Sequence, residues 1–114
     1  MDSYTGKKKH GPEWYIQQDI IKFLRAREWF VKSTHGSLYQ SGFPDLFATH
    51  PTYKQRWIEV KLPNMKGSKF TGAQRITFPL MVAHGSGVWV LTGAIQSEYD
   101  KLFKECNWWQ YLKF

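Results

Sequence analysis

The sequence has few of the residues that build soft-metal sites or covalent cross-links. Cys106 is the single cysteine among 114 residues, which excludes an intramolecular disulfide and a cysteine-rich zinc site. The four histidines are His10, His35, His50 and His84. Because none of them stands at a metal-ligand spacing such as His-x-x-x-His, we do not expect a zinc enzyme.

Long apolar runs are also missing. No stretch has 18 consecutive apolar residues, which is the length that a membrane-spanning helix needs. The N-terminus has no charged segment followed by an apolar one, as a secretory signal peptide would have. We therefore expect a soluble, unsecreted protein of the cytoplasm, a reducing compartment, with no membrane partner.

Acidic residues are scarce relative to basic ones. The chain has 9 Asp and Glu residues against 16 Lys and Arg residues, which gives a formal net charge of +7. Such an excess favours polyanionic partners through the release of their counterions, and nucleic acid is the commonest of these. A charge that only keeps the protein soluble is the alternative. The aromatic content of 18% supplies a core and leaves rings for base stacking or a subunit surface.

The chain is long enough for one domain with a single core. Residues 1–11 are polar, aperiodic and rich in lysine, so they are expected to form a flexible basic arm that lies on phosphates. An unattached tail is the alternative. Residues 12–114 then form the domain, and its aromatic C-terminal tail is expected to pack on the domain or on a second subunit.

Apolar periodicity assigns the elements of that domain. A helix begins at Pro12, and a second follows Thr71, where Gln74 completes a capping box. Pro79 is expected to kink the second helix or to remove a hydrogen bond from it. The order α-β-β-β-α-β plus a C-terminal helix predicts a small α/β domain with a mixed four-stranded sheet flanked by helices. Expected helices are 12–28, 72–83 and 94–106, and expected strands are 29–34, 43–48, 56–62 and 88–92.

Two of these strands bring acids and a lysine together. The proline-containing segment between them is typical of a hairpin turn, and period-2 geometry puts Glu59 and Lys61 on one face of the second strand. With the turn centred near Tyr53, Asp45 lies across from Lys61 and diagonal to Glu59, roughly 7–8 Å away. Two carboxylates at that distance can hold one cation between them.

That arrangement suits the metal-dependent cleavage of a phosphodiester bond. Mg²⁺ and Mn²⁺ take oxygen ligands and keep several waters, and Asp45, Glu59 and the backbone carbonyl of Val60 can supply such ligands. Glu13 is a further direct or water-mediated ligand. Lys61 is placed to orient or deprotonate the attacking water, or to stabilise charge in the transition state. The alternative is a surface hairpin with an ordinary Glu–Lys pair.

Further candidates flank this hairpin. Glu13 and Gln17 fall on the core-facing stripe of the first helix, where polar groups are best explained if they reach the site. For Glu13, an interaction with the helix dipole is the alternative. His35 stands in the loop before Asp45 and is a candidate general base or substrate contact, or simply a solvated residue. Gln74 is accounted for by its cap, although its position in the first turn also allows it to point at the site.

Basic residues supply the candidate contacts to a phosphate backbone. The loop 63–69 directly follows the Glu-x-Lys strand, and its two lysines either clamp phosphates or are merely solvated. Candidate nucleic-acid contacts are Lys7, Lys8, Lys9, Gln17, His35, Lys66, Lys69 and Arg75.

Pro44-Asp45 followed by Glu59-Val60-Lys61 resembles the signature of the PD-(D/E)XK nuclease superfamily. More narrowly, the chain resembles the VRR-NUC group over roughly residues 12–93. The features that carry this resemblance are Glu13-x-x-x-Gln17, Gly42 to Leu46, Ile58 to Lys61, the Thr71-x-x-Gln74 helix start and the strand Gly87 to Leu91. Two departures are Thr71, where that group is expected to have serine, and Pro79 within the second helix.

The resemblance implies a restriction-endonuclease-like αβββαβ core and assigns roles to five side chains. It implies Asp45 and Glu59 as metal ligands and Lys61 as the catalytic lysine, with Mg²⁺ or Mn²⁺ as the cofactor. It further implies Glu13 as an auxiliary acid and Gln74 as a supporting polar residue.

The resemblance also implies a substrate and an assembly. Small stand-alone members of the group are similar to structure-specific endonucleases that act as homodimers on branched DNA, including Holliday junctions, and compact chains of this kind are common in phages. We therefore expect a homodimeric DNA endonuclease of a bacterial or phage-infected cell. The alternatives are a catalytically silent nucleic-acid-binding module of the same fold, an RNA-directed nuclease and a restriction-type enzyme.

Overall fold

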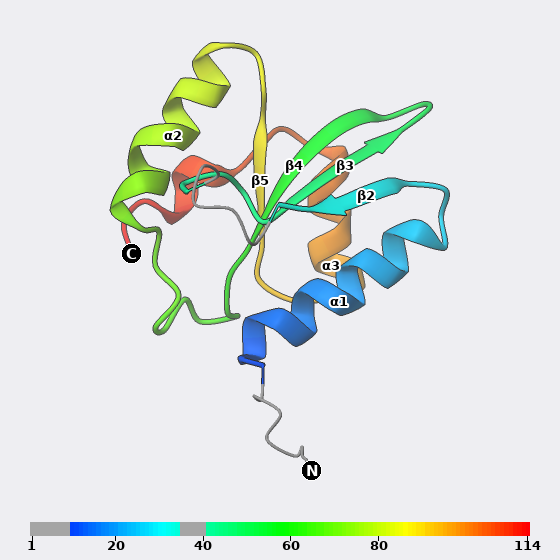
Figure 1. The fold of residues 1–114 in the computed structure, drawn as a ribbon, viewed down its shortest axis with the longest axis horizontal. Coiled ribbons are helices and arrows are strands. Elements are labelled where there is room, and N and C mark those ends of the chain that lie inside the picture. Colours follow the sequence, from blue (N-terminus) through cyan, green and yellow to red (C-terminus); the bar gives the residue numbers. More distant parts are fainter. Residues whose placement is uncertain (1–9, 35–40) are drawn as a thin grey trace.

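The computed structural model describes residues 10–34 and 41–114 of the chain. The expected order α-β-β-β-α-β is observed and is followed by short helical turns (Figure 1). The elements are α1 (Pro12–Arg25), β2 (Phe30–Ser33), β3 (Leu46–His50), β4 (Lys54–Val60), α2 (Gly72–Ala83), β5 (Val88–Leu91), α3 (Gln96–Tyr99), η2 (Asp100–Phe103) and η3 (Trp108–Tyr111). The expected strands are therefore all present, with ends that differ by up to three residues.

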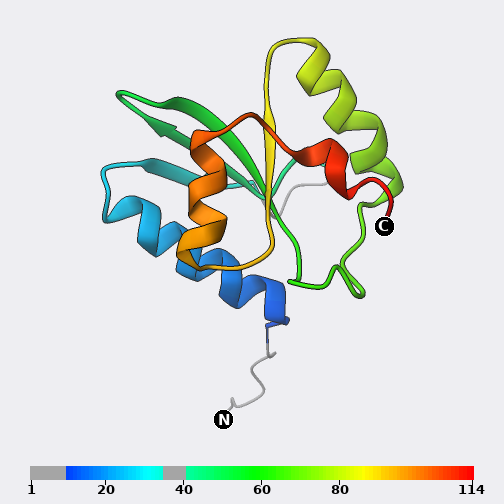
Figure 2. The same ribbon diagram turned by 180° about the vertical axis from the view of Figure 1, so that it is seen from behind.

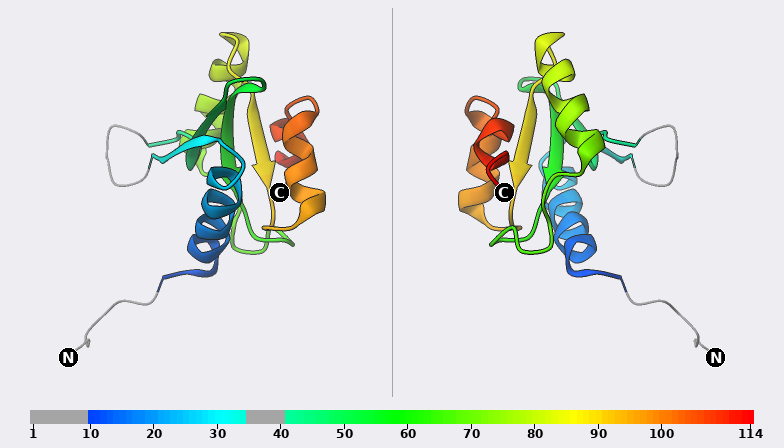
Figure 3. Two further views of the ribbon diagram at one scale, coloured as in Figure 1. Left: turned by 90° about the vertical axis from the view of Figure 1, so that its right-hand side faces the viewer. Right: turned by 90° about the vertical axis from the view of Figure 1, so that its left-hand side faces the viewer.

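The four strands form one mixed sheet in the order β2-β3-β4-β5. The first three strands are antiparallel to one another, whereas β5 is parallel to β4. Helices cover both faces, and Figure 3 shows β5 between α3 on one side and α2 on the other. The mixed four-stranded α/β architecture predicted from the sequence is confirmed.

Alternation along the strands divides the core between the two faces. Ile58 of β4 and Leu91 of β5 belong to the larger cluster, which packs under α1 and α3. Val88 and Val90 of β5 belong to a smaller cluster under α2, centred on the fully buried Phe78. Because side chains alternate between the faces of a strand, Glu59 lies on the α2 face of β4.

Helix α1 begins where the sequence predicts and ends three residues early. Pro12 occupies the first turn, and Glu13 places an acid near the positive end of the helix dipole. The helix ends at Arg25 because the chain then turns, and Glu28 adopts a positive φ of 71° that no α-helix accommodates. No helix in the described ranges is both long and apolar enough to cross a membrane.

Helix α2 begins with the predicted capping box. The Thr71 hydroxyl accepts a hydrogen bond from the Gln74 amide at 3.1 Å, while the Gln74 side chain accepts one from the Thr71 amide at 3.0 Å. The helix continues through Pro79 to Ala83. The cap therefore fixes the position of the Gln74 side chain, which matters for the site described below.

The C-terminal segment departs from the single helix predicted over 94–106. It forms α3 and η2, then extends across the edge of β5 and ends in η3 (Figure 2). The physical reason is a set of bonds to β5: the Asn107 side chain accepts from the Val90 amide at 2.6 Å and donates to the Val90 carbonyl at 3.1 Å. The Asn107 amide thus pairs with both backbone groups of Val90 at the sheet edge, as a neighbouring strand would. The tail then packs on its own domain, with Trp108 and Tyr111 against the smaller cluster.

Candidate active site

The hairpin of β3 and β4 places two carboxylates side by side. The strands pair with Leu46 opposite Ile58, and one further step of that register puts Asp45 opposite Glu59. The prediction that Asp45 faces Lys61 was wrong: Asp45 faces Glu59, two residues earlier, because the turn centres one residue earlier than expected. The correction brings the two acids closer together, since directly opposed side chains have Cβ atoms about 4.5–5.5 Å apart.

Backbone groups hold Asp45 in place at the start of β3. Its side chain is 8% exposed, and its Oδ2 accepts a hydrogen bond from the Val60 amide at 2.8 Å. The Asp45 carbonyl accepts from the Thr34 amide at 2.9 Å, and the Thr34 hydroxyl bonds to the Pro44 carbonyl. The Val60 amide of β4 thus fixes the carboxylate, and Thr34, directly after β2, fixes the backbone that carries it.

The glycine before this acid has a steric reason. Gly42 adopts a φ of +87°, and a Cβ there would lie 2.7 Å from the Thr77 hydroxyl and 2.9 Å from the Ala73 carbonyl oxygen. Both contacts are shorter than van der Waals distance, and one is to helix backbone that cannot move aside. Only glycine therefore lets the segment that carries Asp45 lie directly against α2.

Glu59, Lys61 and Gln74 form one connected polar group. The Lys61 ammonium lies 3.1 Å from Glu59 Oε2 and donates to Gln74 Oε1 at 3.2 Å. The Gln74 side-chain amide in turn donates to Glu59 Oε2 at 2.8 Å. Because the capping box fixes Gln74, the start of α2 orients both the acid and the lysine.

One oxygen of this group has no partner. Glu59 Oε1 is buried and accepts no hydrogen bond from any described residue. Burial raises the pKa of Glu59, the neighbouring charge of Asp45 raises it further, and Lys61 and Gln74 oppose the shift without cancelling it, so that the pKa reaches about 8. The site therefore has more negative charge than its own cation and amide can stabilise.

The structure brings Glu13 to the edge of the site through a residue that the sequence did not single out. Ser68 is buried, and its hydroxyl donates to Glu13 Oε2 while accepting from the Leu62 amide at 3.0 Å. Gln17, one turn further along α1, is buried as its place on the core-facing stripe predicts. A serine in a polar loop gives no periodic signal, so only the path of loop 63–69 reveals this contact.

The predicted phosphate contacts have different surroundings. Lys66 and Lys69 are exposed in the loop that borders the site, and the Lys69 carbonyl accepts a hydrogen bond from the Lys61 ammonium at 3.1 Å. Arg75 is exposed on α2 and donates to the Leu112 carbonyl at 2.9 Å. The candidates Lys7, Lys8, Lys9 and His35 lie outside the described residues.

The donor set suits a hard divalent cation better than a soft one. Asp45 and Glu59 offer carboxylate oxygens, the ligands that Mg²⁺ and Mn²⁺ prefer. Glu59 Oε1 accepts no hydrogen bond and is therefore open to a cation. Within residues 10–34 and 41–114, no three His, Cys, Asp or Glu side chains are grouped to hold a metal ion. Direct ligation by Glu13 or by the Val60 carbonyl therefore stays a prediction, and waters would complete the coordination.

Comparison with protein-family models, with curated proteins and with solved structures finds no match for this chain. The function is therefore argued from the site itself, whose geometry comprises a fixed pair of acids, an adjacent ammonium group and a buried oxygen without a partner.

Proposed function

We propose that this chain is a metal-dependent nuclease of the PD-(D/E)XK type that hydrolyses phosphodiester bonds in DNA. The observation that carries the proposal is the buried, unpartnered Oε1 of Glu59, opposite Asp45 and in the same side chain that pairs with Lys61. The cofactor would be Mg²⁺ or Mn²⁺, held by Asp45 and Glu59.

A purely structural ion pair accounts poorly for this arrangement. A buried carboxylate stabilises a fold only when its oxygens are satisfied, because each unsatisfied buried group costs about 1–3 kcal/mol. Here two acids are fixed beside one lysine, and burial, followed by the charge of Asp45, raises the pKa of Glu59. A divalent cation bound at this position would offset that charge and use the open oxygen.

Each residue of the site then has a definite task. The Val60 amide fixes Asp45, and Gln74 fixes Glu59, so both carboxylates are oriented before a substrate binds. When bound, a divalent cation lowers the pKa of a coordinated water and offsets the charge that develops on the phosphate. The Lys61 ammonium would orient the attacking water or stabilise the transition-state charge.

Charge and resemblance together favour DNA as the substrate. The net charge of +7 and the exposed Lys66 and Lys69 beside the site suit a polyanion. The resemblance to the VRR-NUC group adds branched DNA, such as a four-way junction, as the preferred substrate and a homodimer as the active assembly. These finer assignments are part of the proposal.

A cleavage assay tests the proposal. Wild-type protein and Asp45→Asn would be incubated with duplex, single-stranded, flapped and four-way-junction DNA, and with single-stranded RNA, in Mg²⁺, Mn²⁺ or EDTA. We expect cleavage of DNA that requires metal and is lost in Asp45→Asn, with the junction cut fastest. Glu98→Gln is the matched control, because Glu98 is also an acid paired with a lysine, at 2.7 Å, outside the site.

The other outcomes assign other functions. Binding of DNA without cleavage in any metal would favour a catalytically silent module. Cleavage of RNA alone would replace the substrate class, and cutting of duplex at one sequence would indicate a restriction-type enzyme. Cleavage that survives in Asp45→Asn would remove the central acid from the mechanism.

A further inference from the structure

A hollow of about 400 Å³ runs along the flank of α1, away from the acid pair. Its lining residues all come from α1: Trp14, Gln18, Ile21, Lys22 and Arg25. Successive residues advance about 100° around an α-helix, so these five positions share one stripe. They span twelve residues, whose eleven steps of 1.5 Å cover roughly 16 Å. The hollow is therefore an elongated groove; we call it the α1 groove.

The lining of the α1 groove has cations and no acid. Lys22 is exposed, and no described residue forms an ion pair with it. Asp19, the acid in the middle of α1, lies roughly 120° around the helix from the centre of the stripe. The groove thus carries two positive charges over an apolar floor formed by Ile21, which is 8% exposed. This composition is complementary to a phosphate backbone with its sugars and bases.

Arg25 is positioned rather than loosely solvated. Its Nη2 donates to the Val31 carbonyl of β2 at 2.9 Å, which orients the guanidinium at one end of the groove. A guanidinium has five N–H donors, so several remain for a phosphate oxygen.

Trp14 offers an aromatic platform at the other end. Its side chain is 37% exposed, and the imidazole of His10 stacks on it with 3.7 Å between ring centroids and an interplanar angle of 8°. That parallel stacking is the geometry that a nucleobase needs. Because bases inside a duplex are already stacked on both faces, an indole in this position favours an unpaired strand.

The groove also begins at the end of α1 that carries Glu13, the residue at the edge of the candidate active site. Trp14 directly follows Glu13, whose carboxylate is bonded to Ser68 of the loop that borders Lys61. A strand that leaves the site over the start of α1 would enter the groove at Trp14 and reach Arg25 roughly 16 Å further along the helix.

We infer that the α1 groove binds an unpaired nucleic-acid strand next to the cleavage site, with one base stacked on Trp14 and phosphates on Lys22 and Arg25. This inference rests on the proposed nuclease function for its biological meaning but is tested separately from it. It would give the protein a preference for substrates with a single-stranded segment, such as flaps and opened junctions.

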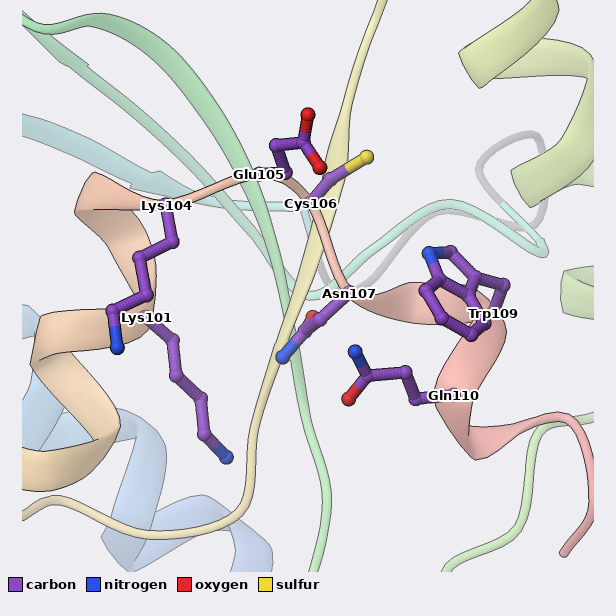
Figure 4. Close-up of a pocket in the computed structure, with 7 residues that line it drawn as sticks. All are labelled: Lys101, Lys104, Glu105, Cys106, Asn107, Trp109 and Gln110. Carbon is purple, nitrogen blue, oxygen red and sulfur yellow. The ribbon is translucent and has the colours of Figure 1, made fainter.

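A second pocket, of about 410 Å³, provides an internal control (Figure 4). It also has an exposed tryptophan, Trp109, and two lysines, but its lining includes the acid Glu105. Lys101 there is already paired with Glu98 at 2.7 Å and bonded to the Tyr111 hydroxyl at 3.1 Å. Similar residue types thus occur in both pockets, but of the two only the α1 groove has no acid among its lining residues.

The test is binding of fluorescein-labelled oligo-dT, oligo-rU and a blunt duplex by anisotropy, in EDTA so that no cleavage occurs. The groove variant is Trp14→Ala with Lys22→Glu, and the matched control is Trp109→Ala with Lys104→Glu, which makes the same change in charge and aromatic content. We expect the groove variant to lose about fifty-fold in affinity for the single strands and the control less than about threefold. Both variants keep Arg25 and its bond to β2, and circular dichroism confirms folding.

Single substitutions separate the two contributions. Trp14→Ala should weaken oligo-dT binding about tenfold with an unchanged salt slope, and Trp14→Phe should restore most of it because a phenyl ring still stacks. Lys22→Glu should instead reduce the salt slope by about 0.7, the value for one phosphate on a single strand.

Equal losses in the groove variant and the control would overturn the inference, because they would indicate a general effect of charge. A loss for duplex as large as for oligo-dT would overturn the assignment to an unpaired strand, and absence of binding by the wild type would overturn it entirely. Groove-dependent binding by a wild type that cleaves nothing in Mn²⁺ would support the groove and contradict the nuclease. Cleavage by the groove variant with unaltered binding would support the nuclease and contradict the groove.

Discussion

Arg56 of β4 and Lys61, which directly follows that strand, are two cations in contrasting surroundings. Arg56 donates three hydrogen bonds, of 2.6, 2.7 and 2.8 Å, to backbone carbonyls and lies over the Trp89 ring. Lys61 instead faces the carboxylate of Glu59 and the amide of Gln74. The Arg56 guanidinium thus bonds to backbone groups that hold the fold together. The Lys61 ammonium instead lies beside the two carboxylates, whose negative charge it only partly offsets.

The comparison separates a structural cation from a candidate functional one. The carbonyl oxygens around Arg56 belong to the β3–β4 hairpin and to η2, so the bonds of this guanidinium join those elements. Around Lys61 the polar groups converge on one point and still leave Glu59 Oε1 open. Polar groups whose hydrogen bonds are all made within the chain indicate a structural role. Polar groups that converge on one point and leave an acceptor without a hydrogen bond indicate a ligand site.

The largest expected effect concerns chemistry at Lys61. Lys61→Met keeps much of the side-chain volume but removes the charge that would act on the water or the phosphate, so cleavage should fall by about 10³-fold. DNA affinity in EDTA should stay within about twofold of wild type. Single-turnover rates and anisotropy measure the two quantities, and unchanged turnover would remove the lysine from the mechanism.

Arg56→Ala should affect stability instead. Loss of the bond to the carbonyl of the buried Leu102, together with two bonds to carbonyls of the exposed turn, should lower the free energy of unfolding by about 1–2 kcal/mol. The cleavage rate per folded molecule should not change. Urea unfolding followed by fluorescence tests this, with Lys32→Ala, an exposed lysine of β2, as the control. Reduced cleavage without reduced stability would abolish the contrast between the two cations.

The raised pKa of Glu59 predicts how the stability of the metal-free protein depends on pH. The pKa is about 8 in the folded state and near 4.5 when unfolded, so the folded state binds the extra proton between these values. Stability contributed by this group is complete below pH 4.5 and is lost as the pH rises through 8. The slope is on the order of 1 kcal/mol per pH unit at most. Urea midpoints in EDTA at pH 5, 6.5 and 8 should fall more steeply for wild type than for Glu59→Gln, and parallel curves would contradict the assigned pKa.

The smallest effects distinguish two roles within one capping box. Thr71→Ala removes the helix cap and should cost about 1 kcal/mol of stability, with cleavage within about twofold of wild type. Gln74→Ala also removes the contacts to Glu59 and Lys61, and cleavage should fall about tenfold more than in Thr71→Ala. Thermal unfolding and initial rates give both values. Equal rates in the two variants would reduce Gln74 to a capping residue.

Local patterns were sufficient to predict much of this molecule. Spacing of apolar residues identified α1 and the strands, and the motif around Thr71 located the start of α2 because a capping box is a contact within four residues. Alternation correctly put Glu59 and Lys61 on the same face of β4. These features depend on near neighbours in the chain, which is why one sequence reveals them.

Features that depend on distant partners could not be predicted. The register of the hairpin differed by two residues because it depends on turn geometry, where Lys54 adopts a positive φ of 66°. The bond between Ser68 and Glu13 joins residues 55 positions apart. Asn107 covers the edge of β5 by side-chain bonds, and no periodic pattern announces such a contact. In each case the missing information is the path of a loop.

Calorimetric titration with Mn²⁺ tests the central claim most directly, because it asks whether Asp45 and Glu59 hold a cation at all. Wild type should bind Mn²⁺ and, at pH 7, release close to one proton as Glu59 ionises, which is seen as a dependence of the heat on the buffer. Asp45→Asn and Glu59→Gln should each lose at least about tenfold in affinity, and Glu59→Gln should also lose the proton release. Glu98→Gln should bind as wild type does. Binding that is absent in wild type, or equal in all four proteins, would contradict the account.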